Sequence, residues 1–170
     1  MKSLSNCLAK GILLVAMGLG MVLLAAGSAV AVIDITVTGS WTQSIDKNNL
    51  TGGAGTNLTS TYTSSQNINL IDITGQTSKW DNWQVNIKRI DTTWNSNLLV
   101  FARRTSNGKG KGSISGGLAY IQVTQSDTTF FTGAGDRSTI TIQLQLTGAS
   151  LTIPPNQYST IIQYTVIDTP

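Results

Sequence analysis

Apolar and polar residues alternate with a period of two through most of the chain after residue 31. The clearest case is the stretch 139–147, where Ile140, Ile142, Leu144 and Leu146 alternate with Thr and Gln. A strand with one buried face has this pattern, because successive side chains of a strand point to opposite sides. No stretch after residue 31 repeats apolar residues at helical spacing, so the sequence predicts an all-β fold.

Turn-forming Gly, Asn, Ser and Pro separate the alternating segments, for example in TGGAGTN, SNGKGKGSISGG and TIPPNQ. Short strands joined by such turns favour antiparallel pairing, since a parallel sheet needs long crossover connections. We expect an immunoglobulin-like antiparallel β-sandwich of about seven to nine strands. The strands expected from the pattern are 33–38, 66–73, 83–90, 98–104, 118–124, 139–147 and 158–167.

The alternation also predicts which side chains face the core. In two strands one row of alternate residues is largely apolar, and the other row is largely polar. The inward rows are Trp83, Val85 and Ile87 in one strand and Ile162, Tyr164 and Val166 in the last. Chain ends usually fray unless they are tied down, so we expect this last strand to be part of the core.

The first 31 residues have the organisation of an export signal. Two Lys precede an apolar run over 12–26, and Ala29-Val30-Ala31 is the small-x-small pattern that signal peptidase cleaves. The run is shorter than the roughly 20 residues of a membrane-spanning helix. We therefore expect a cleaved signal peptide helix over 1–31, a single secreted β-sandwich domain over 32–170, and no stable membrane span after cleavage.

Residues 32–170 contain no Cys, His, Met or Glu. The thiol nucleophile, the imidazole base and the soft metal ligands of common active sites are therefore missing, and we expect neither an enzyme nor a cofactor or metal. Without Cys, stability has to come from packing and hydrogen bonds. Lys and Arg nearly balance Asp in this segment, so nucleic acid is not an expected partner.

Two groups of residues are candidate ligand contacts. Trp80 and Trp94 lie close to Trp83 in the sequence, and each is assigned either to edge packing or to an exposed platform for a sugar ring. Four basic residues belong to the Gly-rich segment 103–117, which is either a grip for phosphates or acidic wall polymer or a mobile, solvated hairpin. They are Arg103, Arg104, Lys109 and Lys111, and alternation places only one of the two Arg on the outer face.

The segment 32–38 is a candidate assembly strand. Ile33, Ile35 and Val37 alternate with Asp and Thr, the pattern of a strand that pairs through its backbone and fills pockets with alternate side chains. Alternation does not distinguish pairing within one subunit from pairing between subunits. The segment therefore either forms the first strand of its own sheet or is donated to another copy.

Two stretches resemble secreted bacterial surface domains. NWQVNIKR is similar to the Trp-led strand of WxL-type wall-binding domains, and PPNQYSTIIQYTVIDTP resembles the closing strand of those domains and of spore-coat-U and pilin-like proteins. The chain has Trp83-Gln84-Val85 in place of Trp-x-Leu, and residues 32–170 lack the Cys of common usher-pathway pilins. The resemblance implies a subunit of a surface fibre or coat.

Together these features predict a non-catalytic extracellular structural protein, a surface or fibre subunit that associates with itself or with other surface proteins. Assembly through the strand 32–38 is part of this hypothesis. The alternative is a carbohydrate- or cell-wall-binding module whose partner is a wall or extracellular polysaccharide. That module would use exposed Trp and the basic segment.

Overall fold

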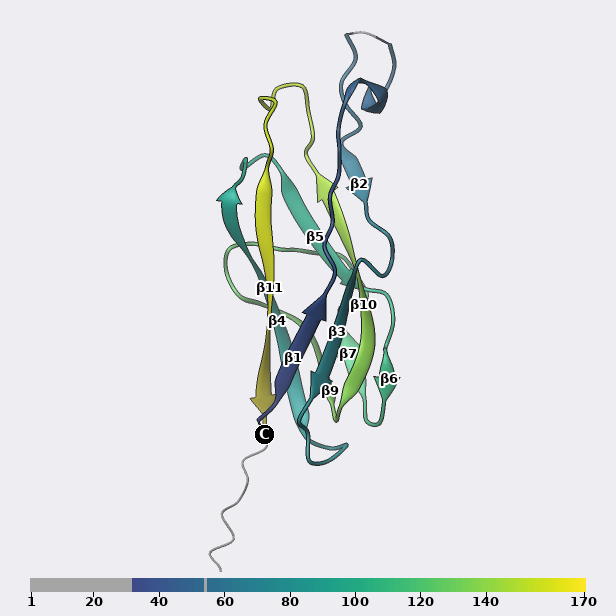
Figure 1. Ribbon diagram of the computed structural model, residues 1–170, viewed down its shortest axis with the longest axis vertical. Helices are drawn as coiled ribbons and strands as arrows, with labels where there is room; N and C mark the ends of the chain where they lie inside the picture. Colours follow the sequence, from purple (N-terminus) through teal and green to yellow (C-terminus); the bar gives the residue numbers. More distant parts are fainter. Residues whose placement is uncertain (1–31, 54) are drawn as a thin grey trace, which may run out of the picture.

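The computed structural model describes residues 32–53 and 55–170, which form two antiparallel sheets packed as a β-sandwich (Figure 1). The expected signal peptide, residues 1–31, lies outside the described residues. A short 3-10 helix, η1 (Lys47–Asn49), precedes β2. Its first turn is capped by Asp46, whose side chain accepts a hydrogen bond from the backbone N–H of Asn48.

The first sheet has the order β1-β3-β10-β5-β8, and β2 and β6 also pair with β10. Its strands are β1 (Asp34–Thr38), β2 (Thr61–Thr63), β3 (Asn69–Thr74), β5 (Leu99–Arg104), β6 (Lys109–Gly110), β8 (Ile121–Gln122) and β10 (Arg137–Thr147). The second sheet has the order β11-β4-β9-β7. Its strands are β4 (Asn82–Thr93), β7 (Ile114–Gly116), β9 (Thr128–Ala134) and β11 (Ser159–Thr169).

After β3 the chain crosses between the sheets at almost every connection. From β4 onward each strand lies in the sheet opposite to the strand before it, apart from the step from β5 to β6. In an immunoglobulin sandwich the last two strands pair within one sheet. Here β10 lies at the centre of the first sheet and β11 at the edge of the second, so the strand order differs from the expected immunoglobulin-like one. The alternation of sheets resembles that of a double-sheet jelly roll.

β10 is the central strand of the first sheet. Along one edge it pairs with β2 and then β3, and along the other with β5 and then β6. On each side of β10, two short strands thus follow one another along its length and are separated by an irregular segment. The interruptions keep hydrogen bonds to β10, because the N–H groups of Ser64 and Thr105 donate to the carbonyls of Leu144 and Thr141.

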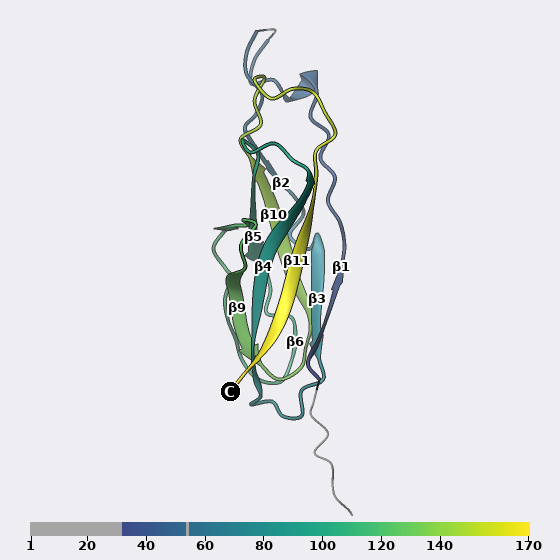
Figure 2. The ribbon, with the colours of Figure 1, turned by 90° about the vertical axis from the view of Figure 1, so that its left-hand side faces the viewer.

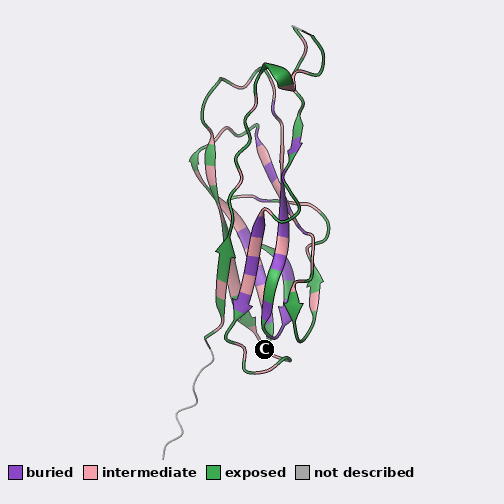
Figure 3. Cartoon of the chain, turned by 45° about the vertical axis from the view of Figure 1, so that its right-hand side comes forward, coloured by how far each residue is buried: buried purple, intermediate pink, exposed green. Residues whose placement is uncertain are grey.

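The core confirms the predicted faces of the long strands. Trp83, Val85 and Ile87 are fully buried on β4, and the apolar row of β10 is buried from Ile140 to Leu144. Figure 3 shows buried residues interspersed with less buried ones along the strands. On β11, Tyr164 is buried, and its neighbours Ile162 and Val166 pack half-buried against the same core. The indole N–H of Trp83 donates to the carbonyl oxygen of Gly135 at 2.8 Å, so its polar atom is satisfied inside the sandwich.

Four strands were missed from the sequence, β2, β6, β7 and β9, as were two irregularities of strand pairing. β9 has two adjacent buried residues, Phe130 and Phe131, because the pairing of β4 with β9 changes register between Val85 and Asn86. A similar shift between Arg137 and Ile140 turns both of these side chains inward although they are three positions apart. β-bulges insert an extra residue and so break the period of two that the sequence analysis depended on.

Candidate functional site

The two candidate platform residues, Trp80 and Trp94, lie at opposite ends of β4. Trp80 precedes the strand and is 72% exposed, whereas Trp94 follows its last residue and is half-buried. β4 has 12 residues. A strand of that length spans about 40 Å at about 3.3 Å per residue. The two indoles therefore do not form one platform for a sugar ring.

Trp94 belongs to the edge of the core. Its indole N–H donates to the carbonyl oxygen of Leu98 at 2.9 Å, and the guanidinium of Arg89 lies 5.3 Å from its ring centroid. It also packs against both groups of buried residues, the main core and a smaller one at the β2 end. Edge packing, one of the two assignments made from the sequence, is what the structure shows for Trp94.

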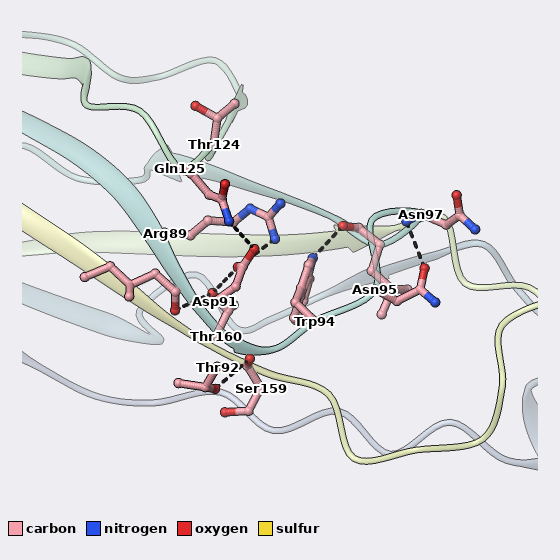
Figure 4. Close-up of polar contacts among 12 residues, drawn as sticks. Arg89, Asp91, Thr92, Trp94, Asn95, Asn97, Thr124, Gln125, Ser159 and Thr160 are labelled. Atoms are coloured by element: carbon pink, nitrogen blue, oxygen red, sulfur yellow. Dashed lines mark hydrogen bonds and ion pairs between the residues drawn. The ribbon is translucent and has the colours of Figure 1, made fainter.

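A polar cluster beside Trp94 joins three segments (Figure 4). Asp91 on β4 accepts hydrogen bonds from Arg89 at 2.9 Å and from the Thr160 hydroxyl of β11 at 2.9 Å through the same carboxylate oxygen. Its other oxygen accepts one from the Gln125 side chain at 2.8 Å. Both oxygens are therefore used within the protein, and the cluster fastens β11 and the segment after β8 to β4.

Trp80 borders an open hollow at the end of the molecule where β11 finishes. The hollow has a volume of about 380 Å³ and is lined by Gln76, Thr77, Trp80, Asp81, Asn82, Asp168, Thr169 and Pro170. One oxygen of Asp81 accepts hydrogen bonds from the hydroxyl and N–H of Thr77 and from the N–H of Ser78. These bonds lower the pKa of Asp81 below its ordinary value, so the rim of the hollow carries a fixed negative charge.

The basic segment is not a hairpin. β6 pairs with β10 in the first sheet and β7 with β9 in the second, so the segment after Arg104 crosses between the sheets. Lys109 and Lys111 are exposed along this crossing. Arg104 is only 2% exposed and is removed from the candidate ligand contacts. Its guanidinium donates to the carbonyl oxygens of Gly116 and Ser106, and burial lowers its pKa, with a further contribution from the positive charge of Arg137.

Arg103 lies on the outer face of the first sheet, as the alternation predicted for one residue of the pair. Its Nε donates to the side-chain oxygen of Gln143 at 2.9 Å, and its guanidinium lies 4.9 Å from the ring centroid of Tyr120. The structure does not bring it together with the exposed Trp80. Tyr120, just before β8, and Gln143 on β10 were missed from the sequence, because nothing local indicates that they meet Arg103.

The candidate assembly strand forms β1 and pairs antiparallel with β3 of its own chain. Ile33 and Ile35 are half-buried against the main core, whereas Val37 is 38% exposed. In this single chain the segment is thus the first strand of its own sheet. Among the described residues β1 pairs with β3 alone, and its other edge is open.

The edge of β11 is open on the same side of the sandwich. β1 lies next to β11 there, as Figure 1 shows, and Figure 2 views the molecule from that side. In the described chain β11 pairs with β4 alone, through a register that extends from Ser159 to Thr169. Ile161 pairs with Ile90 on the outer face of the second sheet, and both are exposed, at 55% and 45%.

The chain matches no protein-family model, no curated protein and no solved structure. In the described part of the chain, no helix has the length and apolar character needed to cross a membrane. Within the same residues, no group of three or more His, Cys, Asp or Glu is placed to hold a metal ion.

Proposed function

We propose that the protein is a non-catalytic extracellular structural subunit that associates with further copies through the side of the sandwich formed by β1 and β11. The observation that carries this proposal is the pair of open strand edges lying next to each other. An open edge presents a row of unpaired N–H and C=O groups, which is a template for another strand.

The composition of β11 supports the proposal. Edge strands of proteins that stay monomeric are usually short or carry Lys, Pro or a bulge that blocks pairing. β11 has 11 residues, no Lys and no Pro, and its one charged residue is Asp168 near the end of the strand. Ile, Val, Thr and Tyr make up most of the strand, and these residues suit extended pairing.

Assembly through residues 32–38 is the second element of the proposal. A copy that donates this segment places Ile33 and Ile35 against the core of a neighbour and pairs with the neighbour's β3, in the register that the chain uses for itself. Exchange of an identical element between subunits forms no new type of contact and costs little free energy at equilibrium. Export through residues 1–31 would deliver the subunit to the cell surface.

Size-exclusion light scattering and negative-stain microscopy of residues 32–170 test this proposal. We expect concentration-dependent oligomers or filaments, and we expect Ile161→Lys combined with Gln163→Lys to reduce them by placing like charges along the β11 edge. The matched control is Thr129→Lys with Thr132→Lys, which adds the same charge to the interior strand β9 of the same sheet. A monodisperse monomer of the unmodified protein at all concentrations would refute assembly.

A second candidate function is binding of carbohydrate through Trp80. The supporting observation is the 72% exposure of this indole beside a hollow lined by carboxylate and amide side chains. This function predicts that a monomer binds wall glycans and that Trp80→Ala abolishes binding without changing the melting temperature. Unchanged binding by that variant would exclude this site.

A further inference from the structure

Arg103 is held in a fixed orientation on the outer face of the first sheet. Its Nε donates to Gln143 Oε1, which also accepts a hydrogen bond from the Tyr120 hydroxyl at 3.0 Å. Gln143 is 6% exposed, and its amide N–H donates to the backbone oxygen of Ser64 at 2.8 Å. The side chain that orients Arg103 is therefore itself locked by the backbone of a neighbouring segment.

The two terminal nitrogens of Arg103 have no acceptor among the described residues, although the side chain is half-buried and stacked on Tyr120. The ion pairs of residues 32–53 and 55–170 are Lys88 with Asp127 and Arg89 with Asp91. Arg103 thus lacks a carboxylate within 4.0 Å in that part of the chain. The carboxylate of Asp72 lies across β10 on the same face, where it accepts the N–H of Thr139.

The side chains in the row next to Arg103 are uncharged and partly aromatic. The next outward row of the sheet places Phe101 between Gln145 on β10 and Gln122 on β8. Phe101 is half-buried and Gln122 is exposed. Aromatic faces and amide groups suit the apolar faces and hydroxyls of sugar rings, and a guanidinium with two free nitrogens matches a carboxylate in a bidentate manner.

We propose that this face binds a polysaccharide whose sugars carry carboxylates, with Arg103 as the residue that contacts the carboxylate. Gln143 and Tyr120 act as positioning residues, because they hold the guanidinium through its Nε and its face and leave its two terminal nitrogens without an acceptor in the described chain. A carboxylate of the ligand supplies the negative charge that pairs with Arg103, since the described chain supplies none. This site is separate from the β1 and β11 edges, so it does not depend on assembly.

Affinity electrophoresis in gels containing polygalacturonate tests the proposal, with the methyl-esterified polymer as the uncharged comparison. We expect the purified protein to be retarded by the acid form alone. Arg103→Gln should weaken retardation about tenfold or more, and Arg103→Lys should restore only part of it, because an ammonium keeps the charge but lacks the planar fork.

Lys88→Gln is the matched control, because it removes one positive charge from the outer face of the other sheet. Tyr120→Leu tests positioning, and we expect it to reduce retardation less than Arg103→Gln does. Melting temperatures of all variants establish that each is folded. The proposal is overturned by absence of retardation, by equal retardation in the esterified polymer, or by equal losses in Arg103→Gln and Lys88→Gln.

Discussion

The two edge strands on one side of the sandwich, β11 and β1, differ in how much of the core they supply. β11 is paired with β4 along its whole length and buries Tyr164 between the sheets. β1 has five residues, none of them buried, and its Ile35, together with Ile33 just before the strand, only covers the side of the core. An edge strand can therefore either supply buried side chains to the core, as β11 does, or only cover the core from outside, as β1 does. We expect that only a covering strand can detach without unfolding the domain.

Tyr164 explains much of this difference. Its ring lies 6.3 Å from that of Phe130 on β9, and its hydroxyl is 3.4 Å from the side-chain oxygen of Asn69 on β3. One residue of the last strand thus contacts both sheets. The strong strand pattern at the end of the sequence corresponds to this contribution to the core.

The largest expected effect comes from removing Tyr164–Pro170. The truncated chain loses Tyr164 and Val166 from the core and exposes half of the β4 edge, so we expect loss of the cooperative folded state. Near-ultraviolet circular dichroism and thermal melting measure this. A truncated protein that still melts cooperatively would show that β11 is a cover like β1.

Tyr164→Ala should destabilise the domain by about 3–5 kcal/mol, the cost of deleting a large buried aromatic side chain. Urea unfolding gives the free energy of unfolding. For comparison, Tyr158→Ala affects a half-buried Tyr outside the main core and should cost less. Similar losses for the two variants would contradict the assignment of Tyr164 to the centre of the sandwich.

Ile35→Ala should cost about 1–2 kcal/mol, because its side chain is only half-buried. Its register partner on β3, Ile73, is fully buried, so Ile73→Ala should cost about 2–5 kcal/mol. Urea unfolding of both variants compares the free energy of unfolding lost from β1 with that lost from its partner strand β3. An Ile35→Ala loss as large as that of Ile73→Ala would place β1 in the core.

Tyr164 also makes the stability of the folded domain depend on pH in the alkaline range. Burial raises the pKa of its hydroxyl, so above its ordinary value of about 10 the unfolded chain loses a proton that the folded chain retains. Stability should therefore fall as the pH rises above that value. Tyr164→Phe, expected to cost about 1 kcal/mol at neutral pH, should make the alkaline limb of a stability–pH curve shallower.

The smallest expected effect on stability is that of Ile161→Lys, within about 0.5 kcal/mol, because the side chain is exposed. Assembly is the property that should change, since the residue lies on the open edge strand. Light scattering at matched concentrations measures it. A large loss of thermal stability together with unchanged oligomers would separate this residue from assembly.

Much of each strand could be predicted from the sequence, and less of the site. Alternation correctly assigned the inward rows of β4, β10 and β11 and placed one residue of Arg103 and Arg104 on the outer face. It missed β9, where a bulge interrupts the period. Trp80 and Trp94 were grouped as candidate contacts because they lie close in the sequence, whereas the length of β4 separates them in space.

The sequence by itself determined the all-β character and the buried face of each long strand, because a period of two is a local property of an extended chain. Only the tertiary structure decided the order of the strands, the crossing of the basic segment between sheets, and the meeting of Arg103 with Tyr120 and Gln143. Backbone hydrogen bonds are the same for any two strands, so the choice of neighbours depends on how all side chains pack together.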